Sequence, residues 1–159
     1  MQGSKVCWAV TAASLAAVAA MGYMFLIRGS VTESADGRTA ILLAGSERDL
    51  VLAEMRGFLE SVQSIVAAVS GNDMATVAAS ARKVGSAAAN EVPVTVMGKL
   101  PLEFKTLGLA THSAFDEIAL EAEGIGSGEA VLAGLGKLLL NCTSCHAGYR
   151  LALEAPGTK

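Results

Sequence analysis

An uncharged apolar stretch near the amino terminus is the feature that most constrains how this chain can fold. Residues 6–27 contain no Asp, Glu, Lys or Arg. Inside a bilayer every backbone polar group must find its partner within the chain, so a stretch of this kind spans the membrane as an α-helix. A helix over these residues rises about 33 Å, which is enough to cross the hydrocarbon core. We therefore expect residues 1–28 to hold an N-terminal transmembrane helix, inserted in the inner membrane through residues 6–27.

Two fates are open for this segment. Lys5 precedes it, and Ala17, Val18 and Ala19 form a small-residue cleavage site of the kind found in secretory signals. The apolar run continues to Ile27, which is longer than a signal needs and favours a retained anchor. In both cases the rest of the chain is exported. Retention predicts an inner-membrane protein with its main domain in the periplasm, and cleavage predicts a soluble periplasmic protein.

Composition and charge narrow the choices for the rest of the chain. Apolar residues make up 52% of the 159 residues but aromatic residues only 4%. Small aliphatic side chains suit closely packed helices better than a β-sandwich. The formal net charge is −3, and the sequence has no basic patch and no run of like charge. We therefore expect no nucleic-acid partner, and a mildly acidic surface that steers a basic partner.

Beyond the membrane segment the sequence predicts a spacer and then a first helix. Residues 29–45 are interpreted as the spacer, polar at first with a short apolar tail. Ser46 and Asp49 have the spacing of a capping box that opens the helix, and Gly71 with Asn72 ends it. Its apolar stripe recurs at steps of four and three residues, through Val51, Met55, Phe58, Val62, Ile65 and Val69.

Three further helices complete the predicted domain. Asp73 caps the second, whose buried face is small-sided, so a neighbouring helix or a second subunit in a homodimer can approach closely; this face runs through Met74, Val77, Ala78, Ala81, Val84 and Ala88. Pro101 suits the first turn of the third helix, and a glycine-rich break at 124–128 ends it. The fourth helix carries the stripe Val131, Leu135, Leu138, Cys142, Cys145 and Tyr149. With no strand alternation or hairpin signal recognised, we predict an all-α fold, an antiparallel four-helix bundle over residues 46–159.

A motif of two cysteines and a histidine, C-T-S-C-H at residues 142–146, lies on the stripe of the fourth helix. A thioredoxin-type redox pair needs a βαβ setting, which the sequence does not suggest. A zinc site needs four ligands, whereas the exported part has two Cys and two His, with Cys145 and His146 adjacent. A disulfide between Cys142 and Cys145 is chemically feasible after export, but it would close too short a loop to constrain the chain.

The spacing C-x-x-C-H is the attachment pattern of c-type haem. On a helix, positions i and i+3 bring both sulfurs within reach of two porphyrin vinyl groups, and the next residue directs an imidazole toward the iron. Export fits as well, because covalent haem attachment takes place outside the cytoplasm. We therefore expect one covalently bound haem c, held by Cys142 and Cys145, with His146 as an iron ligand.

The same segment resembles a known family. A four-helix bundle with a single C-x-x-C-H-x-x-Y-R near its carboxyl end resembles the class II c-type cytochromes, the cytochrome c′ family. The resemblance covers about residues 46–153, its specific part is "CTSCHAGYR", and "LPLEFKTLGLATHSAFDEIA" is similar to the third helix of membrane-anchored relatives. It implies that Cys142 and Cys145 are the thioether anchors and His146 the proximal ligand. It also implies that Arg150 lies by the proximal face of the haem; the alternative for Arg150 is a surface cation at the last helical turn. Tyr149 is expected to pack in the core.

The resemblance also places one residue of the first helix against the distal face of the haem, and Met55 fits by its position on the stripe. In the low-spin branch a methionine sulfur ligates the iron there, whereas in other c′ proteins an apolar residue leaves the iron five-coordinate. The family commonly has Arg-Gln before this position and the present chain has Val51-Leu52, which favours the low-spin branch. Core filling by Met55 remains an alternative. His112 is the rival ligand, although pairing with Asp116 one turn later is the preferred interpretation.

These features predict a periplasmic, membrane-anchored monohaem c-type cytochrome. Ligation by Met55 and His146 would raise the reduction potential and suit the transfer of single electrons between redox partner proteins. The alternative function is a five-coordinate, c′-like haem protein that binds nitric oxide or carbon monoxide. No enzymatic activity is expected, because no distal acid–base pair is recognised besides His112.

Overall fold

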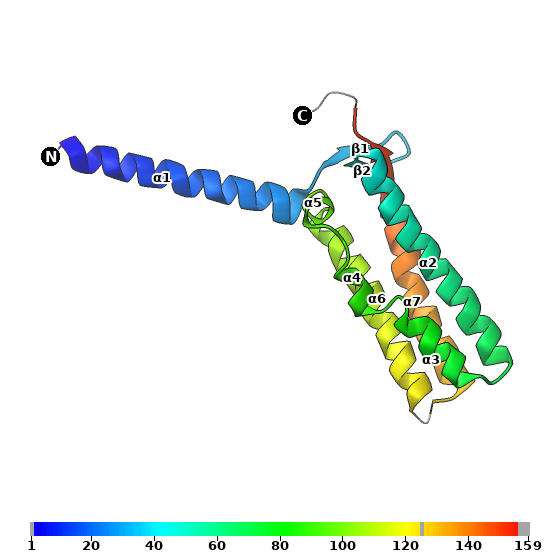
Figure 1. Cartoon of the computed structure of the whole chain (residues 1–159). Helices are drawn as coiled ribbons and strands as arrows, with labels where there is room; N and C mark the ends of the chain where they lie inside the picture. Colours follow the sequence, from blue (N-terminus) through cyan, green and yellow to red (C-terminus); the bar gives the residue numbers. More distant parts are fainter. Residues whose placement is uncertain (1, 125, 156–159) are drawn as a thin grey trace.

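The computed structural model of the chain describes residues 2–124 and 126–155, with side chains from residue 5 onward. Met1, Ile125 in the expected glycine-rich break, and residues 156–159 of the expected helical domain lie outside this description. The helices are α1 (Gln2–Gly22), the π-helix η1 (Tyr23–Arg28), α2 (Gly45–Ser70), α3 (Met74–Arg82), α4 (Ser86–Ala89), α5 (Val94–Met97), α6 (Leu102–Glu123) and α7 (Gly128–Gly148). The strands are β1 (Val31–Glu33), β2 (Thr39–Leu43) and β3 (Tyr149–Leu153). The chain is mostly helical, and α1 extends away from the remaining elements (Figure 1).

Helices α1 and η1 form the apolar N-terminal segment that the sequence predicts. Within the described part of the chain, Lys5–Arg28 is the helical stretch long and apolar enough to cross a membrane, with a mean hydropathy of 1.9. Its aromatic side chains Trp8 and Tyr23, toward the two ends, are exposed. Such amphipathic rings are common where a spanning helix meets the headgroups. Length and composition therefore fit either a membrane-spanning helix or a secretory signal sequence.

Four helices, α2, α3, α6 and α7, pack around one apolar core, which we call the helical core. The contacts join α3 to α2 and α6, and α7 to α6 and α2. Its buried members are Ile65, Ala68, Val77, Ala78, Ala81, Val84, Phe115, Ile118, Ala119, Ala122, Val131, Leu135 and Leu138. Alanines of both α3 and α6 are among them, so the small side chains expected in the second helix do bring it close to a neighbouring helix.

The second helix is shorter than its sequence pattern predicts. α3 ends at Arg82, and a separate short helix, α4, follows. A β-carbon on Gly85 would overlap the carboxylate of Asp116, and the same carboxylate accepts a hydrogen bond from the Ser86 N–H at 2.8 Å. The Asp116 carboxylate therefore binds the first N–H of α4, and Arg82, the last residue of α3, pairs with the same carboxylate at 3.2 Å.

Helix ends follow the predicted signals in part. Asp73 accepts a hydrogen bond at the start of α3, and Asn72 has the left-handed φ of +53° expected at the stop before it. The start of α2 differs from the predicted capping box of Ser46 and Asp49. The helix begins at Gly45, and the Glu47 carboxylate in its first turn accepts a hydrogen bond from the Ala44 N–H at 2.8 Å. The carboxylate that supports this end is thus Glu47 and not Asp49.

A three-stranded sheet corrects the prediction of a purely helical exported part. β1 pairs antiparallel with β2, with Val31 opposite Ile41. β2 pairs parallel with β3, with Thr39 opposite Tyr149. Residues 29–45, interpreted above as a spacer, therefore contain a β-hairpin. The fourth helix also ends earlier than predicted, at Gly148, so Tyr149 belongs to β3.

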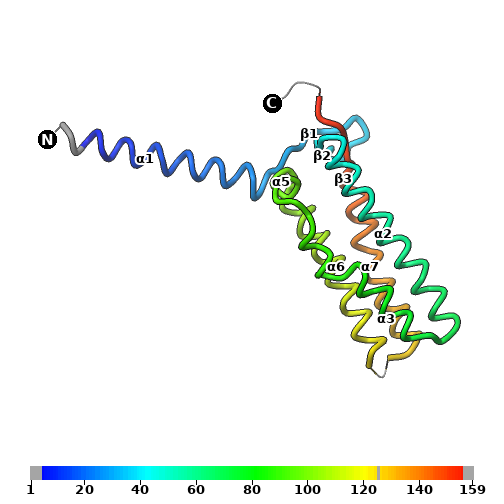
Figure 2. Tube along the Cα trace, viewed as in Figure 1, coloured from blue at the N-terminus to red at the C-terminus, as the bar shows by residue number. Residues whose placement is uncertain are grey.

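The sheet lies at one end of the packed helices and forms a second apolar core, which we call the sheet-end core. Its buried members are Ile41, Leu43, Val51, Val96, Leu100 and Phe104. Figure 2 shows the sheet beside α5, near the end of the N-terminal helix and far from the turn between α2 and α3. Partly buried side chains around this core include Met55, Cys145 and Tyr149.

Gly29 joins the N-terminal helix to the domain through a close backbone contact. Its φ is +67°, and a β-carbon at this position would overlap the carbonyl of Lys99. The next residue, Ser30, donates its N–H to the same carbonyl at 2.7 Å. The Lys99 ammonium pairs with Glu47 at 2.6 Å and Glu154 at 2.7 Å, which ties the junction to α2 and to the end of β3. The junction is therefore built into the domain.

The last turn of η1 contacts the domain as well. Lys105 of α6 donates from its ammonium group to the carbonyls of Phe25 and Leu26, both at 3.2 Å. Cations are favourable at the negative end of a helix, where carbonyls lack intrahelical donors. Gly98 lies against the Phe25 ring, where a β-carbon would come within 3.2 Å of the ring edge.

Candidate functional site

The C-x-x-C-H motif occupies the last turns of α7. The helix ends two residues after it, and the chain then extends into β3. Cys142 and Cys145 are half-buried free thiols, and His146 is exposed. Cys142 packs against the helical core, whereas Cys145 packs against the sheet-end core. The motif therefore lies where the two cores meet.

A pocket of about 210 Å³ opens beside this motif. Its lining comes from α2, α6, α7, the hairpin turn and β3, and consists of Arg38, Arg48, Leu52, Met55, Phe104, Cys145, His146, Tyr149, Arg150 and Leu151. Apart from Leu52, the apolar part of this lining belongs to, or packs against, the sheet-end core. The arginines lie on α2, the hairpin turn and β3.

Three of the four predicted site residues line this one pocket. Met55 comes from α2, and Cys145 and His146 come from the end of α7. Cys142 does not line the pocket; it lies one helical turn earlier, against the helical core. No hydrogen bond or ion pair involves the His146 ring in the described part of the structure, so its nitrogens are available to a ligand.

The thiol pKa of each motif cysteine is raised above its ordinary value. Burial raises the pKa of the Cys142 thiol, and burial with the neighbouring Cys142 raises the pKa of Cys145 to about 11. Redox-active cysteine pairs depend instead on a lowered thiol pKa. The electrostatics of this motif therefore differ from those of an activated disulfide-exchange site.

The charged part of the pocket lining is cationic. Arg38, Arg48 and Arg150 contribute to it, and no Asp or Glu does. The guanidinium of Arg48 has no ion-pair or hydrogen-bond partner among the described residues. Asp36, outside the lining, pairs with two of these arginines, Arg38 and Arg150. Such a lining suits a ligand with an apolar body and anionic groups.

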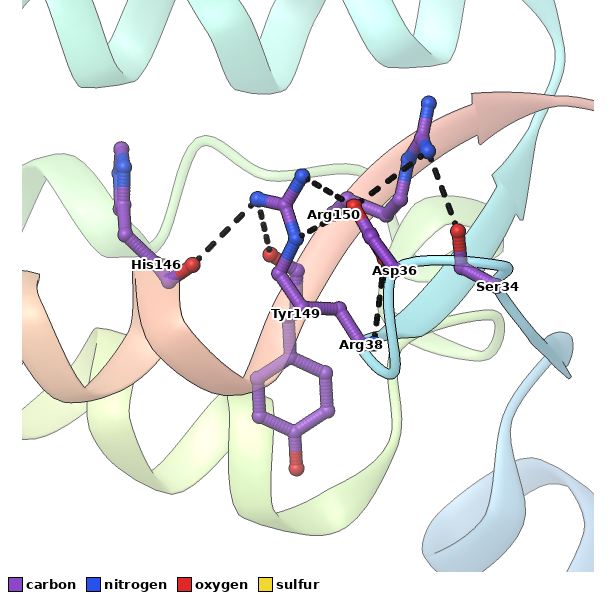
Figure 3. A network of polar contacts seen from close by, with 6 residues as sticks. All are labelled: Ser34, Asp36, Arg38, His146, Tyr149 and Arg150. Carbon is purple, nitrogen blue, oxygen red and sulfur yellow. Dashed lines mark hydrogen bonds and ion pairs between the residues drawn. The ribbon is translucent and has the colours of Figure 1, made fainter.

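A polar network connects the hairpin turn to the end of the motif (Figure 3). Arg38 donates to the carbonyls of His146 and Tyr149, at 3.4 Å and 3.5 Å. Its guanidinium pairs with Asp36 at 2.7 Å, and these hydrogen bonds hold the pKa of the Asp36 carboxyl well below its usual range. Arg38 therefore compensates the carbonyls at the end of α7 and orients the backbone beside His146.

Arg150 takes part in the same network from β3. It donates to the Ser34 hydroxyl at 3.1 Å and lies 3.6 Å from Asp36. We expected Arg150 on the fourth helix, one turn after His146. This expectation is wrong, because α7 ends at Gly148 and Arg150 belongs to β3. Arg150 nevertheless lines the same pocket as His146, and Arg38 serves as the cation at the last helical turn.

Tyr149 packs as expected but from a strand. Its ring meets the edge of Phe104 with centroids 5.5 Å apart, and its hydroxyl donates to Glu103 at 2.9 Å. Burial and this hydrogen bond raise the pKa of Tyr149 to about 12. The phenol therefore stays protonated and links β3 to the start of α6.

His112 lies in a different place with different partners. It is 4% exposed, with Nδ1 at 2.8 Å from the Val84 carbonyl and Nε2 at 3.3 Å from Glu54. The expected pairing with Asp116 is therefore wrong, because that carboxylate is bonded to the start of α4. His112 lines a separate pocket of about 240 Å³ between α2, α4 and α6, which His146 does not line.

Sequence reasoning missed Arg38, Arg48 and Phe104 as lining residues. Arg48 and Phe104 carry no local signal, because their role depends on which helices meet. Arg38 follows Asp36-Gly37, a dipeptide typical of hairpin turns, with β-forming residues on both sides. That pattern predicts a hairpin, and with it an arginine at a turn.

No three His, Cys, Asp or Glu side chains within residues 2–124 and 126–155 are grouped so that they could hold a metal ion. Haem iron needs fewer protein ligands, because the porphyrin supplies the equatorial ones and axial residues such as His and Met complete the set. Comparison with protein-family models, with curated proteins and with solved structures finds no match to this chain.

Proposed function

We propose that this chain is a membrane-anchored c-type cytochrome that holds one haem c and passes single electrons between redox partner proteins in the periplasm. One observation carries the proposal: Met55 of α2 lines the same pocket as Cys145 and His146 of the C-x-x-C-H motif. Two segments far apart in sequence thus bring a thioether, a thiol and an imidazole together. These are the groups that hold a covalently attached haem with His and Met ligands.

The proposal includes the fold of the class II c-type cytochromes, the cytochrome c′ family. In it, α2, α3, α6 and α7 are the antiparallel four-helix bundle, with the attachment motif at the end of the last helix. The packing of these four helices around one core supports this assignment. The three-stranded sheet is a departure from a purely helical bundle, and it supplies part of the pocket.

Each residue has a separate role in this proposal. Cys142 and Cys145 would hold the haem through thioether bonds, and His146 and Met55 would ligate its iron. The bound haem supplies the one-electron couple. The exposed ring of His146 is unpartnered among the described residues, which suits an axial ligand. The thioether of Met55 favours reduced iron and so raises the potential.

The pocket lining fits such a group in chemistry and in part in size. Its apolar side chains suit the macrocycle, and its arginines suit the carboxylates at the edge of a haem. The volume of about 210 Å³ is below the roughly 300–1,000 Å³ of typical ligand pockets, so much of the macrocycle would lie at the open side. No substrate chemistry is part of the proposal.

A second function, binding of nitric oxide or carbon monoxide at an open sixth position, is favoured by one observation. Met55 packs against the sheet-end core, which is also what a core-filling side chain does. In this second proposal Met55 would shape the distal side without ligating the iron. The two functions share Cys142, Cys145 and His146 and differ only at Met55.

Haem attachment is tested by replacing both motif cysteines. We expect the Cys142→Ala/Cys145→Ala protein, produced with periplasmic haem maturation, to carry no haem after denaturing electrophoresis. Cys7→Ala is the control, because Cys7 lies in α1 outside the motif and its replacement should leave the haem stain intact. Haem stain on the double variant, or its absence from the wild type, would contradict the proposal.

A further inference from the structure

We propose that the domain makes a second contact with lipid beside the anchor, through Val94 at the start of α5 and Leu102 at the start of α6. This inference rests on the membrane anchoring proposed above and is independent of the haem. The partner is the headgroup and upper acyl region of the phospholipid bilayer. The contact would tilt the domain onto the membrane surface instead of leaving it to stand free.

The end of α5 and the first turn of α6 lie against the last turn of the anchor. Gly98, which follows α5, lies close to the Phe25 ring, since a β-carbon added to it would be 3.2 Å from the ring. On α6, the Lys105 ammonium reaches the Phe25 and Leu26 carbonyls at 3.2 Å. Figure 1 shows α5 beside the end of the N-terminal helix. This part of the domain therefore lies at the level where the anchor leaves the membrane.

The side chains at this place are apolar and exposed. Val94 is 84% exposed, the most of the large hydrophobic side chains described, and Leu102 is 46% exposed. On the anchor side, Phe25, Leu26 and Ile27 are exposed too. Apolar surface thus continues from the anchor onto the domain, which is the arrangement expected of a lipid-facing surface.

The orientation of α6 also indicates that Leu102 lies on the side of the domain that faces the anchor. Leu102 and Lys105 are three residues apart and so share one face of the helix. Lys105 reaches the anchor, which places this face, with Leu102, on the anchor side. Arg28 ends the anchor at the same level. Cations beside exposed apolar side chains match the headgroup region of a bilayer, where phosphates lie above the acyl chains.

Photocrosslinking in phospholipid vesicles tests the contact. The full chain is reconstituted with benzoylphenylalanine at position 94, 102 or 132, irradiated and digested, and lipid adducts are measured by mass spectrometry. Leu132 is the matched control: it is also 46% exposed, but it lies in the first turns of α7, far from the anchor. We expect lipid adducts at positions 94 and 102 and no lipid adduct at position 132.

The outcomes separate the contact from the anchor. Adducts at 94 and 102 without one at 132 would support the proposal. Retention of the protein in the vesicles after a carbonate wash, with no adduct at 94 or 102, would overturn the second contact and leave the anchor in place. Equal adducts at all three positions would overturn it as well. Release of the protein by carbonate would overturn both the anchor and the contact.

Discussion

Met55 is the residue at which the two proposed functions differ. Its side chain lines the pocket beside His146 and packs against the sheet-end core. Met97 packs against the same core and does not line the pocket, so it has a similar packing role without access to the site. The pair thus allows ligation to be separated from packing.

We expect Met55→Leu in the haem-loaded protein to convert low-spin ferric haem to high spin and to lower the reduction potential, because a soft thioether ligand is lost. The swap nearly conserves volume, so its packing cost should stay under about 1.5 kcal/mol. Visible spectra and a redox titration measure the change, and Met97→Leu should leave both unaltered. A wild type that is already high-spin and binds carbon monoxide readily would make gas binding the preferred function. A spectrum altered by His112→Ala but not by Met55→Leu would move the ligand to α6.

His112 couples the stability of the fold to pH. Burial of the ring lowers its pKa, but the hydrogen bonds to Glu54 and to the Val84 carbonyl outweigh burial and raise the pKa above 6.5 overall. Both ring nitrogens face acceptors, which favours the charged imidazolium. A raised pKa in the folded state means that the stabilisation is complete below 6.5, the unfolded value, and is lost as pH rises through the folded value.

The free energy of unfolding should therefore fall as pH rises through the folded pKa of His112. Urea denaturation of the full chain in detergent at a series of pH values measures this slope. His112→Gln should flatten it, and Glu54→Gln should reduce it by removing the charge that faces Nε2. An unchanged slope in His112→Gln would assign the pH dependence to other groups.

At the level of single residues, the sequence predicts those site residues that are close together in a motif or along one helix. Cys145 and His146 could be grouped because they belong to one motif, whereas Met55 was placed beside them by the resemblance to the cytochrome c′ family and by its position on a helical stripe. The partner of His112 could not be predicted in this way. Asp116 has the right spacing on α6, but Ser86 and Arg82, from other elements, already bind it.

Among the elements, the helices were predictable and the sheet was not. The stripes of α2, α6 and α7 extend over many turns, which makes a helical period easy to recognise. β1 and β2 are short, although Asp36-Gly37 indicates their turn. β3 pairs in parallel with β2 across more than a hundred residues, and nothing in the local sequence specifies such a partner.

Two glycines have a positive φ for different reasons: one lies in the open hairpin turn and the other in the crowded junction after the N-terminal helix. Gly29 and Gly37 have φ of +67° and +81°, but only Gly29 has neighbouring atoms where a β-carbon would be placed. We expect Gly37→Ala to lower the free energy of unfolding by roughly 1–2 kcal/mol through backbone strain alone. Gly29→Ala should lower the free energy of unfolding further, because the added β-carbon would overlap the Lys99 carbonyl and push the two segments apart. Urea denaturation compares the two, and equal losses would argue against a tightly packed junction.

In the molecule as a whole, the candidate site lies at the end of the domain nearest the N-terminal helix. The sheet-end core includes Val96 and Leu100, close to the junction, and Met55 and Cys145 lie around this same core. The helical core extends away from it toward the turn between α2 and α3 (Figure 1). The far end of the helices therefore contributes to stability, while the chemistry proposed here is concentrated at the end of the domain next to the N-terminal helix.

The packed junction at Gly29 has a consequence for how the proposed carrier meets its partners. A flexible linker would let an anchored domain sample many orientations above the bilayer, whereas this packed junction would hold the pocket of an anchored domain at one distance from the membrane. Encounters are then governed by lateral diffusion in two dimensions, and a membrane-bound partner must present its own redox centre at the same level. A freely diffusing partner must come down to the lipid surface to exchange an electron. The packed junction would therefore restrict the carrier to partners whose redox centre reaches the same height above the membrane, whatever side chains line the pocket.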